Sequence, residues 1–210
     1  MKVTLLIPTF NEIKTVKLIM PRVKKEWVHE ILVIDAPSTD GTAEYMKSLG
    51  YKVIVQKKPG LMWAWWEGVE AAEGDVILPL TPDNNSIPEA IPELIAKMEE
   101  GYDMVVASRY KDGAKSYEDD FLSGWANYLF NKISNFLFWS NFTDALTSYR
   151  AFRKDLPKEL GLTTKTAIRF NIYNCDVYQI ILNMRCAKMK KRVAEIGFDE
   201  PDRIDGTMGR

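Results

Sequence analysis

Apolar residues gather along the first half of the chain in short continuous runs, separated by segments in which apolar residues recur at helical spacing. A run that is apolar at every position is typical of a strand buried on both faces of a parallel sheet. These runs predict strands at Val3–Ile7, Ile31–Asp35, Val53–Gln56, Asp75–Leu80 and Met104–Ser108. The segments between them predict helices at Ile13–Val23, Ala43–Leu49, Trp63–Ala72 and Glu89–Glu99. The alternation predicts an α/β fold with a mostly parallel central sheet flanked by helices.

The pattern changes after residue 108. A long helix with many aromatic residues is predicted at Phe121–Trp139, and a second helix at Ile172–Ala187. Short strands are predicted at Tyr149–Phe152 and Arg192–Ile196. No internal repeat or low-complexity linker divides the chain, so we expect a single domain over residues 1–210.

Charge and composition exclude several classes of protein. With a net charge of −1 the chain has no general electrostatic basis for binding nucleic acid. Two cysteines and one histidine cannot form a zinc site without carboxylate ligands, and reduced thiols suit a cytosolic compartment. The apolar run at the N-terminus is too short for a signal peptide or a membrane span. We therefore expect a cytoplasmic protein, either soluble or peripheral on the cytoplasmic face of a membrane.

Polar residues follow the second predicted strand directly. Asp35 ends that strand, and Asp40 lies in the Ser/Thr/Gly-rich turn that follows. Ligands of open α/β sheets bind at the carboxyl ends of such strands, which predicts a role for both carboxylates in holding a polar ligand. The alternative is purely structural, with Asp40 or Thr42 capping the next helix. Taken alone, this stretch favours neither interpretation.

A second candidate site follows the fourth predicted strand. Asp83 and Asn85 offer hard oxygen ligands two residues apart, which suits one Mg²⁺ or Mn²⁺ shared with phosphates. The alternative is an Asx-rich turn, which Pro82 and Pro88 also favour. In isolation the turn is the more common explanation.

Six segments taken together resemble the family 2 inverting nucleotide-sugar glycosyltransferases, most closely those of the dolichyl-phosphate mannose synthase type. They are IPTFNE (7–12), VIDAPSTDGT (33–42), AAEGDVILPLTPDNNSIPEAIPEL (71–94), ASRY (107–110), TDALTSYRAFRK (143–154) and VAEIGFDEPDRIDG (193–206). No single segment is decisive, but the ordered set is specific and spans nearly the whole chain. The resemblance implies a GT-A (Rossmann-like) fold, with residues 1–108 binding the nucleotide and residues 109–210 forming the acceptor side.

The resemblance also implies the donor site. The donor would be a nucleotide diphosphate-sugar of the GDP-mannose or UDP-glucose type, with Mg²⁺ or Mn²⁺ held by Asp83 and Asn85. The residues implied in nucleotide binding are Pro8, Thr9, Glu12, Asp35, Asp40 and Arg203, the last closing over the diphosphate. Two positions depart from the family pattern. Ala36 and Thr81 stand where the family usually has the second carboxylate after the second strand and the first carboxylate of its Asp-x-Asp loop.

On the acceptor side the resemblance implies roles for Arg109, Ser148 and Arg150 in acceptor binding. Asp144 is the expected general base, which would take the proton of an attacking hydroxyl. The alternative for Asp144 is a helix cap or an ion-pair partner of Arg150 or Arg153. The acceptor would be a polyprenyl (dolichyl) phosphate or a glycan or lipid hydroxyl. A phosphate acceptor needs cations and no base, because it is already an anion.

The aromatic helix Phe121–Trp139 has two open interpretations. Trp and Tyr favour the membrane interface, so the helix could lie on a bilayer surface. It could equally be a core helix or an interface between copies in an oligomer. For Trp63, Trp65 and Trp66, packing beneath the sheet is the expectation.

Together these observations predict a metal-dependent inverting hexosyltransferase. The alternative is a nucleotide-sugar-binding or regulatory module with little or no turnover, which Ala36 and Thr81 motivate. A nucleotidyltransferase is a weaker third interpretation, because Pro8–Glu12 is not the Gly-rich basic loop such enzymes ordinarily carry after their first strand.

Overall fold

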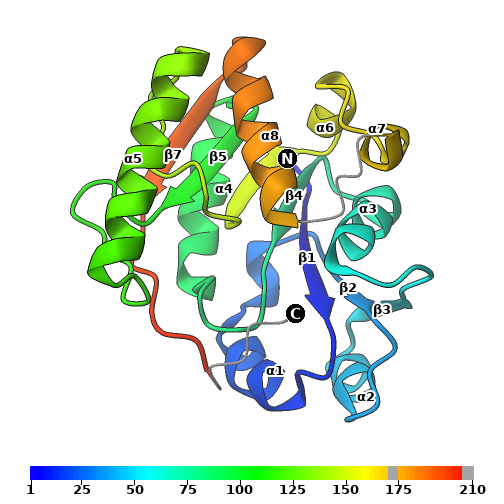
Figure 1. Cartoon of the computed structure of the whole chain (residues 1–210). Helices are drawn as coiled ribbons and strands as arrows, with labels where there is room; N and C mark the ends of the chain where they lie inside the picture. The colour runs from blue at the N-terminus through cyan, green and yellow to red at the C-terminus, as the bar shows by residue number, and fades with distance from the viewer. Residues whose placement is uncertain (170–174, 205–210) are drawn as a thin grey trace.

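A seven-stranded sheet forms the centre of the protein in a computed structural model that describes residues 1–169 and 175–204. The strand order is β3-β2-β1-β4-β6-β5-β7 (Figure 1). The strands are β1 (Val3–Thr9), β2 (Glu30–Asp35), β3 (Lys52–Val55), β4 (Val76–Pro79), β5 (Met104–Ser108), β6 (Arg150–Arg153) and β7 (Val193–Gly197). All pairs are parallel except those of β6, which runs antiparallel to both β4 and β5. The predicted α/β class with a mostly parallel sheet is confirmed.

The helices cover both faces of this sheet (Figure 1). They are α1 (Ile13–Ile19), α2 (Thr42–Ser48), α3 (Leu61–Ala71), α4 (Ile91–Glu99), α5 (Phe121–Phe138), α6 (Leu156–Glu159), α7 (Thr164–Arg169) and α8 (Cys175–Lys188). The helix predicted to reach Val23 ends earlier, because Pro21 cannot continue the hydrogen-bond ladder and lies in a 3₁₀ turn, Met20–Arg22. The short helices α6 and α7 were not predicted. The predicted start of the last helix at Ile172 lies outside the described residues.

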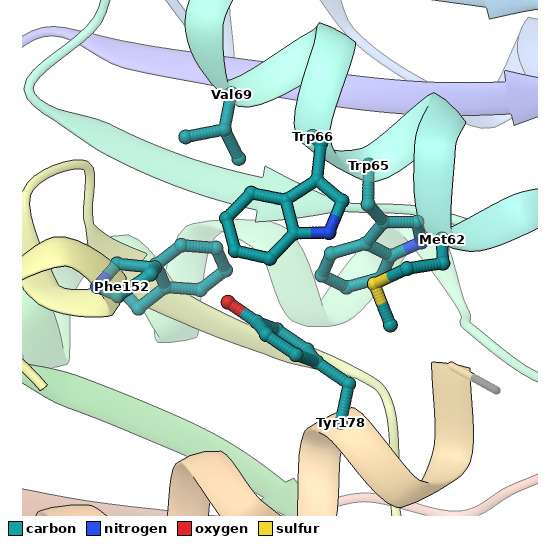
Figure 2. A pocket seen from close by; sticks show the side chains of 7 residues that line it. Met62, Trp65, Trp66, Val69, Phe152 and Tyr178 are labelled. Atoms are coloured by element: carbon teal, nitrogen blue, oxygen red, sulfur yellow. The ribbon is translucent and has the colours of Figure 1, made fainter. Parts of the chain in front are cut away.

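One face of the sheet packs against α3 and α8. Leu6 of β1 points to this face, where Trp65 stacks on Phe152 with ring centroids 6.5 Å apart. Trp66 meets Tyr178 edge to face at 5.3 Å, beside the small hollow shown in Figure 2. The prediction that the tryptophans pack beneath the sheet is confirmed for these two.

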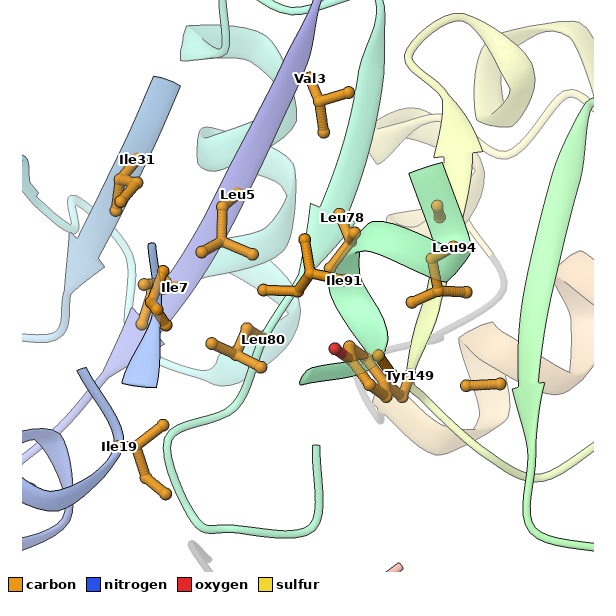
Figure 3. Close-up of a cluster of buried hydrophobic side chains, with 14 of the residues drawn as sticks. Val3, Leu5, Ile7, Ile19, Ile31, Leu78, Leu80, Ile91, Leu94 and Tyr149 are labelled. Atoms are coloured by element: carbon orange, nitrogen blue, oxygen red, sulfur yellow. The ribbon is translucent and has the colours of Figure 1, made fainter. Parts of the chain in front are cut away.

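The opposite face packs against α1, α2 and α4. Leu5 and Ile7 flank Leu6 in β1, and because side chains alternate along a strand they point to this second face. They contribute to the cluster in Figure 3, to which α4 adds Ile91 and Leu94. With both faces buried, a strand must be apolar at consecutive positions, which explains the continuous runs in the sequence.

Helix α5 has its polarity reversed relative to an ordinary surface helix. Its amide side chains face the protein, where Asn131 donates to the carbonyl of Thr143 at 3.0 Å and accepts from the N–H of Ala145 at 2.8 Å. Most of its apolar side chains face outward, and Phe136 is 82% exposed, whereas Phe130 packs against the core. Among the described residues, the exposed apolar set along this segment is Leu122, Trp125, Tyr128, Leu129, Ile133, Phe136, Leu137, Phe138 and Trp139. The core-helix interpretation is therefore wrong.

Helix length and composition bear on membrane insertion. Within the described parts of the chain, no helix combines the length and the apolar character that crossing a bilayer requires.

Candidate active site

The candidate active site lies along one edge of the sheet. Strands β1, β2, β4 and β5 are all oriented alike, so their carboxyl ends open onto the same edge. The loops that leave these ends contain most of the residues predicted from the sequence. Three groups of side chains form there: a carboxylate group on the β1 and β2 side, the loop after β4, and a buried ion pair after β5.

Asp35 joins the ends of β1 and β2. Its carboxylate is 1% exposed and accepts hydrogen bonds from the hydroxyl of Thr9 at 2.9 Å and that of Ser38 at 2.7 Å. The backbone N–H of Ser38 donates to the second oxygen at 2.9 Å. Because these bonds fix the first residues of the loop, Asp35 shapes the floor of the site. Pro8 and Thr9 are buried in β1 beside it.

Asp40 links α1 and α2. One oxygen accepts from the N–H and the hydroxyl of Thr42 at 3.0 and 2.6 Å, and the other accepts from the N–H of Ile13 at 3.0 Å. These contacts satisfy N–H groups at the starts of both helices, so Asp40 has the helix-capping role of the structural alternative. Its predicted contact with a nucleotide stays a prediction.

Glu12 lies between these carboxylates and the loop after β4. Burial raises the pKa of Glu12 from 4.5 to about 7, against a hydrogen bond from the N–H of Phe10 that lowers it. The negative charges of Asp83, Asp40 and Asp35 raise it further. The edge of the sheet is thus strongly acidic, and a diphosphate would be repelled from it unless a cation were present.

The loop after β4 holds the two predicted metal ligands. One oxygen of Asp83 accepts from the hydroxyl of Thr81 at 3.0 Å and from the N–H of Asn85 at 3.1 Å. Thr81, which replaces the first carboxylate of the family motif, therefore orients Asp83. Burial raises the pKa of Asp83, and the charge of Arg203 lowers it in part.

Two oxygens in this loop fit a divalent cation. Oδ1 of Asn85 is buried and has no hydrogen-bond partner among the described residues, while its Nδ2 donates to Glu118 at 2.9 Å. The second oxygen of Asp83 faces only the guanidinium of Arg203 within the described chain, at 3.9 Å. Hard oxygens of this kind suit Mg²⁺ or Mn²⁺. The described residues contain no cluster of three His, Cys, Asp or Glu side chains that could hold a metal, so further ligands would have to come from phosphates or water.

A segment near the C-terminus, residues 199–204, lies over this loop, and we call it the strap. Its backbone pairs with the segment after β5, where the N–H of Glu200 donates to Lys115 at 2.9 Å and the N–H of Tyr117 donates back at 3.0 Å. Farther along, the N–H of Ile204 donates to the carbonyl of Asp83 at 3.1 Å. Arg203, predicted from the sequence to close over the diphosphate, is thereby brought to the candidate metal loop.

A buried ion pair lies in the part of the site that the sequence predicts to be the acceptor side. Asp144 is completely buried, and its carboxylate accepts from Nε of Arg109 at 2.7 Å, from Nη2 at 3.0 Å and from the backbone N–H at 3.1 Å. The N–H groups of Leu146 and Thr147 donate to the same carboxylate at 3.2 and 3.1 Å. Nη1 of Arg109 meets Glu200 of the strap at 3.3 Å. The ion-pair partner of Asp144 is thus Arg109, not Arg150 or Arg153 as the alternative interpretation had it.

Arg150 and Ser148 lie differently from Arg109. Arg150 is completely buried in β6, where its guanidinium donates to Asn183 at 2.6 Å and to the carbonyl of Thr147. Such a position leaves no surface for an acceptor in this conformation. Ser148 is half-buried in the loop before β6. The structure does not bring Arg150 to the exposed part of the site.

Three glutamates of the site were missed in the sequence. Glu195 of β7 accepts from the N–H and hydroxyl of Thr143 and from the N–H of Asp144, at 2.9 to 3.2 Å. Glu200 and Glu118 hold Arg109 and Asn85, as described above. Glu195 and Glu200 fall inside the segment VAEIGFDEPDRIDG. For Glu195, the available signal was an acidic residue within a predicted strand, Arg192–Ile196.

Comparison with known proteins agrees with the resemblance seen in the sequence. Residues 4–161 match the family described as glycosyl transferase family 2. The glycosyltransferase AglJ of Haloferax volcanii is 31% identical over 77% of this chain, and the match covers 54% of that protein. The dolichol-phosphate mannosyltransferase of Pyrococcus furiosus is 35% identical over 55% of this chain and 35% of its own length. The chain therefore spans about half and about a third of these two relatives.

Two further matches cover nearly the whole chain. The undecaprenyl-phosphate mannosyltransferase of Micrococcus luteus is 28% identical over 93% of this chain and 82% of its own. Among solved structures, glucosyl-3-phosphoglycerate synthase from Mycobacterium tuberculosis, in complex with Mn²⁺, UDP and phosphoglyceric acid, superposes with a TM-score of 0.66. That match has 18% identity and covers 99% of this chain and 71% of the other, so it shows a shared fold.

The raised pKa of Glu12 predicts a pH-dependent stability. The folded protein holds the Glu12 proton more tightly than the unfolded chain, so this contribution is full below pH 4.5 and is lost as the pH rises through about 7. Replacing Glu12 by Gln removes the ionisation. Because wild type loses this contribution as the pH rises, the free energy of unfolding of Glu12→Gln relative to wild type should increase by roughly 2 kcal/mol on going from about pH 5 to about pH 8. Urea unfolding at both pH values measures this, and parallel profiles for the two proteins would contradict it.

Proposed function

The chain belongs to glycosyl transferase family 2, and on that premise we propose that it moves a hexose from a nucleotide diphosphate-sugar to a polyprenyl phosphate. Relatives whose names include dolichol-phosphate and undecaprenyl-phosphate mannosyltransferase support this acceptor class. The observation that carries the proposal is the proximity of two kinds of site along one sheet edge. Oxygens suited to a divalent ion lie on the loop after β4, and the strap joins that loop to the guanidinium of Arg109.

On the donor side, Asp83 and Asn85 would hold Mg²⁺ or Mn²⁺. When bound, the ion supplies Lewis-acid neutralisation of the charge that builds on the leaving nucleoside diphosphate. Asp35 and Thr9 shape the floor on which the nucleoside rests, and Glu12 offers a carboxyl at its rim that can accept from ribose hydroxyls or base N–H groups. The donor nucleotide we expect is GDP or UDP.

On the acceptor side, Arg109 would bind the acceptor phosphate. Its guanidinium keeps a fixed orientation because Asp144 and Glu200 hold it on two sides, and its side chain is 13% exposed. A guanidinium has five N–H donors, so bonds to these carboxylates still leave donors for an oxyanion. With a phosphate acceptor, Asp144 then acts by positioning Arg109.

A hydroxyl acceptor would assign a different role to Asp144. It would then be the general base, and its carboxylate would first have to release part of its bonding to Arg109, Leu146 and Thr147. The many donors on Asp144 in the structure favour the phosphate acceptor over a glycan hydroxyl.

We further propose that the outward face of α5 contacts a membrane surface, where a polyprenyl phosphate resides. Nearly all its exposed side chains are apolar or aromatic, and Lys132 is the one charged residue in the helix. Trp and Tyr rings are favoured at the depth of lipid headgroups. An apolar groove of about 540 Å³ between α5 and α8 is lined in part by Arg185 and by the exposed Lys188, and such cations complement lipid phosphates.

A non-catalytic module is the second candidate, because Thr81 and Ala36 replace family carboxylates. Release of nucleoside diphosphate in a single turnover with Mn²⁺ and polyprenyl phosphate distinguishes the two. Donor binding without any release would favour the module.

The metal site predicts the effect of Asp83→Asn. Asparagine keeps an oxygen for the bonds from Thr81 and the N–H of Asn85 but removes the charge that would hold the metal. Wild type should gain about 2.7 kcal/mol of stability at roughly a hundredfold excess of Mn²⁺ and nucleotide-sugar over Kd, and the variant should lose most of that gain. Thermal unfolding with and without Mn²⁺ measures the shift. The control is Asp112→Asn, an exposed residue at positive φ where asparagine is tolerated. A full Mn²⁺-dependent shift in Asp83→Asn would rule out this ligand.

The α5 face predicts binding to lipid vesicles. In the double variant Phe136→Ser, Trp139→Ser, each lost aromatic ring should weaken partitioning by about tenfold, because the burial of each ring is worth about 1.5 kcal/mol or more. Co-sedimentation with phosphatidylcholine vesicles measures the partitioning. Leu18→Ser, which changes an exposed apolar residue of α1, should leave it unchanged. If wild type does not sediment with vesicles but forms a dimer that the double variant abolishes, the face is an interface between copies instead.

A further inference from the structure

Arg203 faces two carboxylates above the candidate metal loop. Its Nε lies 3.9 Å from Oδ2 of Asp83 and 3.3 Å from Oε1 of Glu118. The same Glu118 accepts from Nδ2 of Asn85 at 2.9 Å, so both oxygen-bearing residues of the loop are linked to the Arg203 guanidinium. A positive charge therefore already lies where the loop would hold a divalent ion.

The bonding of this guanidinium is weak compared with that of Arg109. Nε of Arg203 is buried but makes no well-aligned hydrogen bond with any residue in the described ranges. Arg109, in contrast, makes two side-chain hydrogen bonds of 2.7 and 3.0 Å to a single carboxylate. Charge attraction without directed hydrogen bonds holds a side chain less firmly, and the Arg203 side chain is 31% exposed.

The strap does not depend on this guanidinium for its position. Bonds to its main chain join it to the loop: the Ile204 N–H donates to the carbonyl of Asp83 at 3.1 Å, and the side-chain Nδ2 of Asn84 donates to the carbonyl of Asp202 at 2.9 Å. The N–H of Arg203 itself donates to Glu118 at 3.1 Å. The side chain can therefore turn away while the backbone stays in place.

We propose that the Arg203 guanidinium acts as a stand-in cation, by which we mean that it occupies the place of the divalent ion. Glu118 and Asp83 hold it there while no metal is bound. Arg203 competes with a divalent ion for Asp83, because two cations close to one oxygen repel each other. Once displaced, its guanidinium is available for the diphosphate. The inference rests on the metal site of the proposed function. It adds that Arg203 weakens metal binding in the absence of nucleotide. In the presence of a nucleoside diphosphate, Arg203 strengthens it.

The test is calorimetric titration of the purified full chain with Mn²⁺ alone. We expect Arg203→Gln to bind Mn²⁺ about tenfold more tightly than wild type, because the competing charge is gone. Arg203→Lys keeps the charge and should stay near wild type. Arg192→Gln, which removes an exposed arginine at the opposite edge of the sheet, is the matched control and should have no effect. With GDP or UDP present the order should reverse, with Arg203→Gln binding Mn²⁺ more weakly than wild type.

The outcomes separate this inference from the proposed function. If wild type binds Mn²⁺ and Arg203→Gln binds it no more tightly, the stand-in role is overturned and the metal site survives. If neither protein binds Mn²⁺, whether alone or with GDP or UDP present, both proposals fail. If the tighter binding of Arg203→Gln persists when Asp83→Asn is added, the ion lies elsewhere and the stand-in role is again overturned. Thermal unfolding of each variant checks that the fold is intact.

Discussion

The buried ion pair of Asp144 and Arg109 is the interaction on which the part of the protein after β5 depends. Burial alone would lower the pKa of Arg109, but the hydrogen bonds and charge of Asp144, with the charge of Glu200, raise it above its usual value. Removing one partner of such a pair leaves an uncompensated buried charge and costs about 3–5 kcal/mol. The pair joins the end of β5 to the loop before β6, and through Glu200 it fixes the strap. Helix α5 is attached to the same loop by Asn131.

The two arginines of the site differ in a way that suits two tasks. Arg109 is locked by aligned hydrogen bonds, so it presents a cation in one orientation. Arg203 faces Asp83 and Glu118 at longer distances and is free to exchange them for another anion. The donor side is rich in carboxylates, which makes any diphosphate dependent on a cation for binding. The proposed acceptor side thus has a cation of fixed orientation, and the proposed donor side has an exchangeable one.

Much of the fold could be predicted from the sequence, because a sheet buried on both faces needs continuous apolar strands. All seven strands were anticipated to within a few residues, and β5 was placed at its observed bounds. The antiparallel direction of β6 is not encoded in any local pattern, since it follows from pairing with β4 and β5. The inverted polarity of α5 was also hidden, because its apolar content alone does not show which side faces the protein.

The site was predictable in its positions and less so in its contacts. Asp35 ends β2, and Asp83 and Asn85 lie in the loop after β4, so their placement at one edge is a consequence of parallel topology. The partner of Asp144 comes from the end of β5, and Glu195 and Glu200 come from β7 and the strap. Those contacts join segments far apart in sequence, and only the folded chain brings them together. Arg150 was assigned to the acceptor by resemblance, but its side chain is completely buried at the start of β6.

The central claim is transfer of a hexose to a polyprenyl phosphate. The most direct measurement incubates the protein with Mn²⁺, polyprenyl phosphate and labelled GDP-mannose or UDP-glucose, and then extracts the lipid. The account predicts label in the lipid phase with one of these donors, and its loss when Arg109 is replaced by Gln in a variant that still binds the donor. Donor binding with no label in the lipid from any nucleotide-sugar would contradict the account.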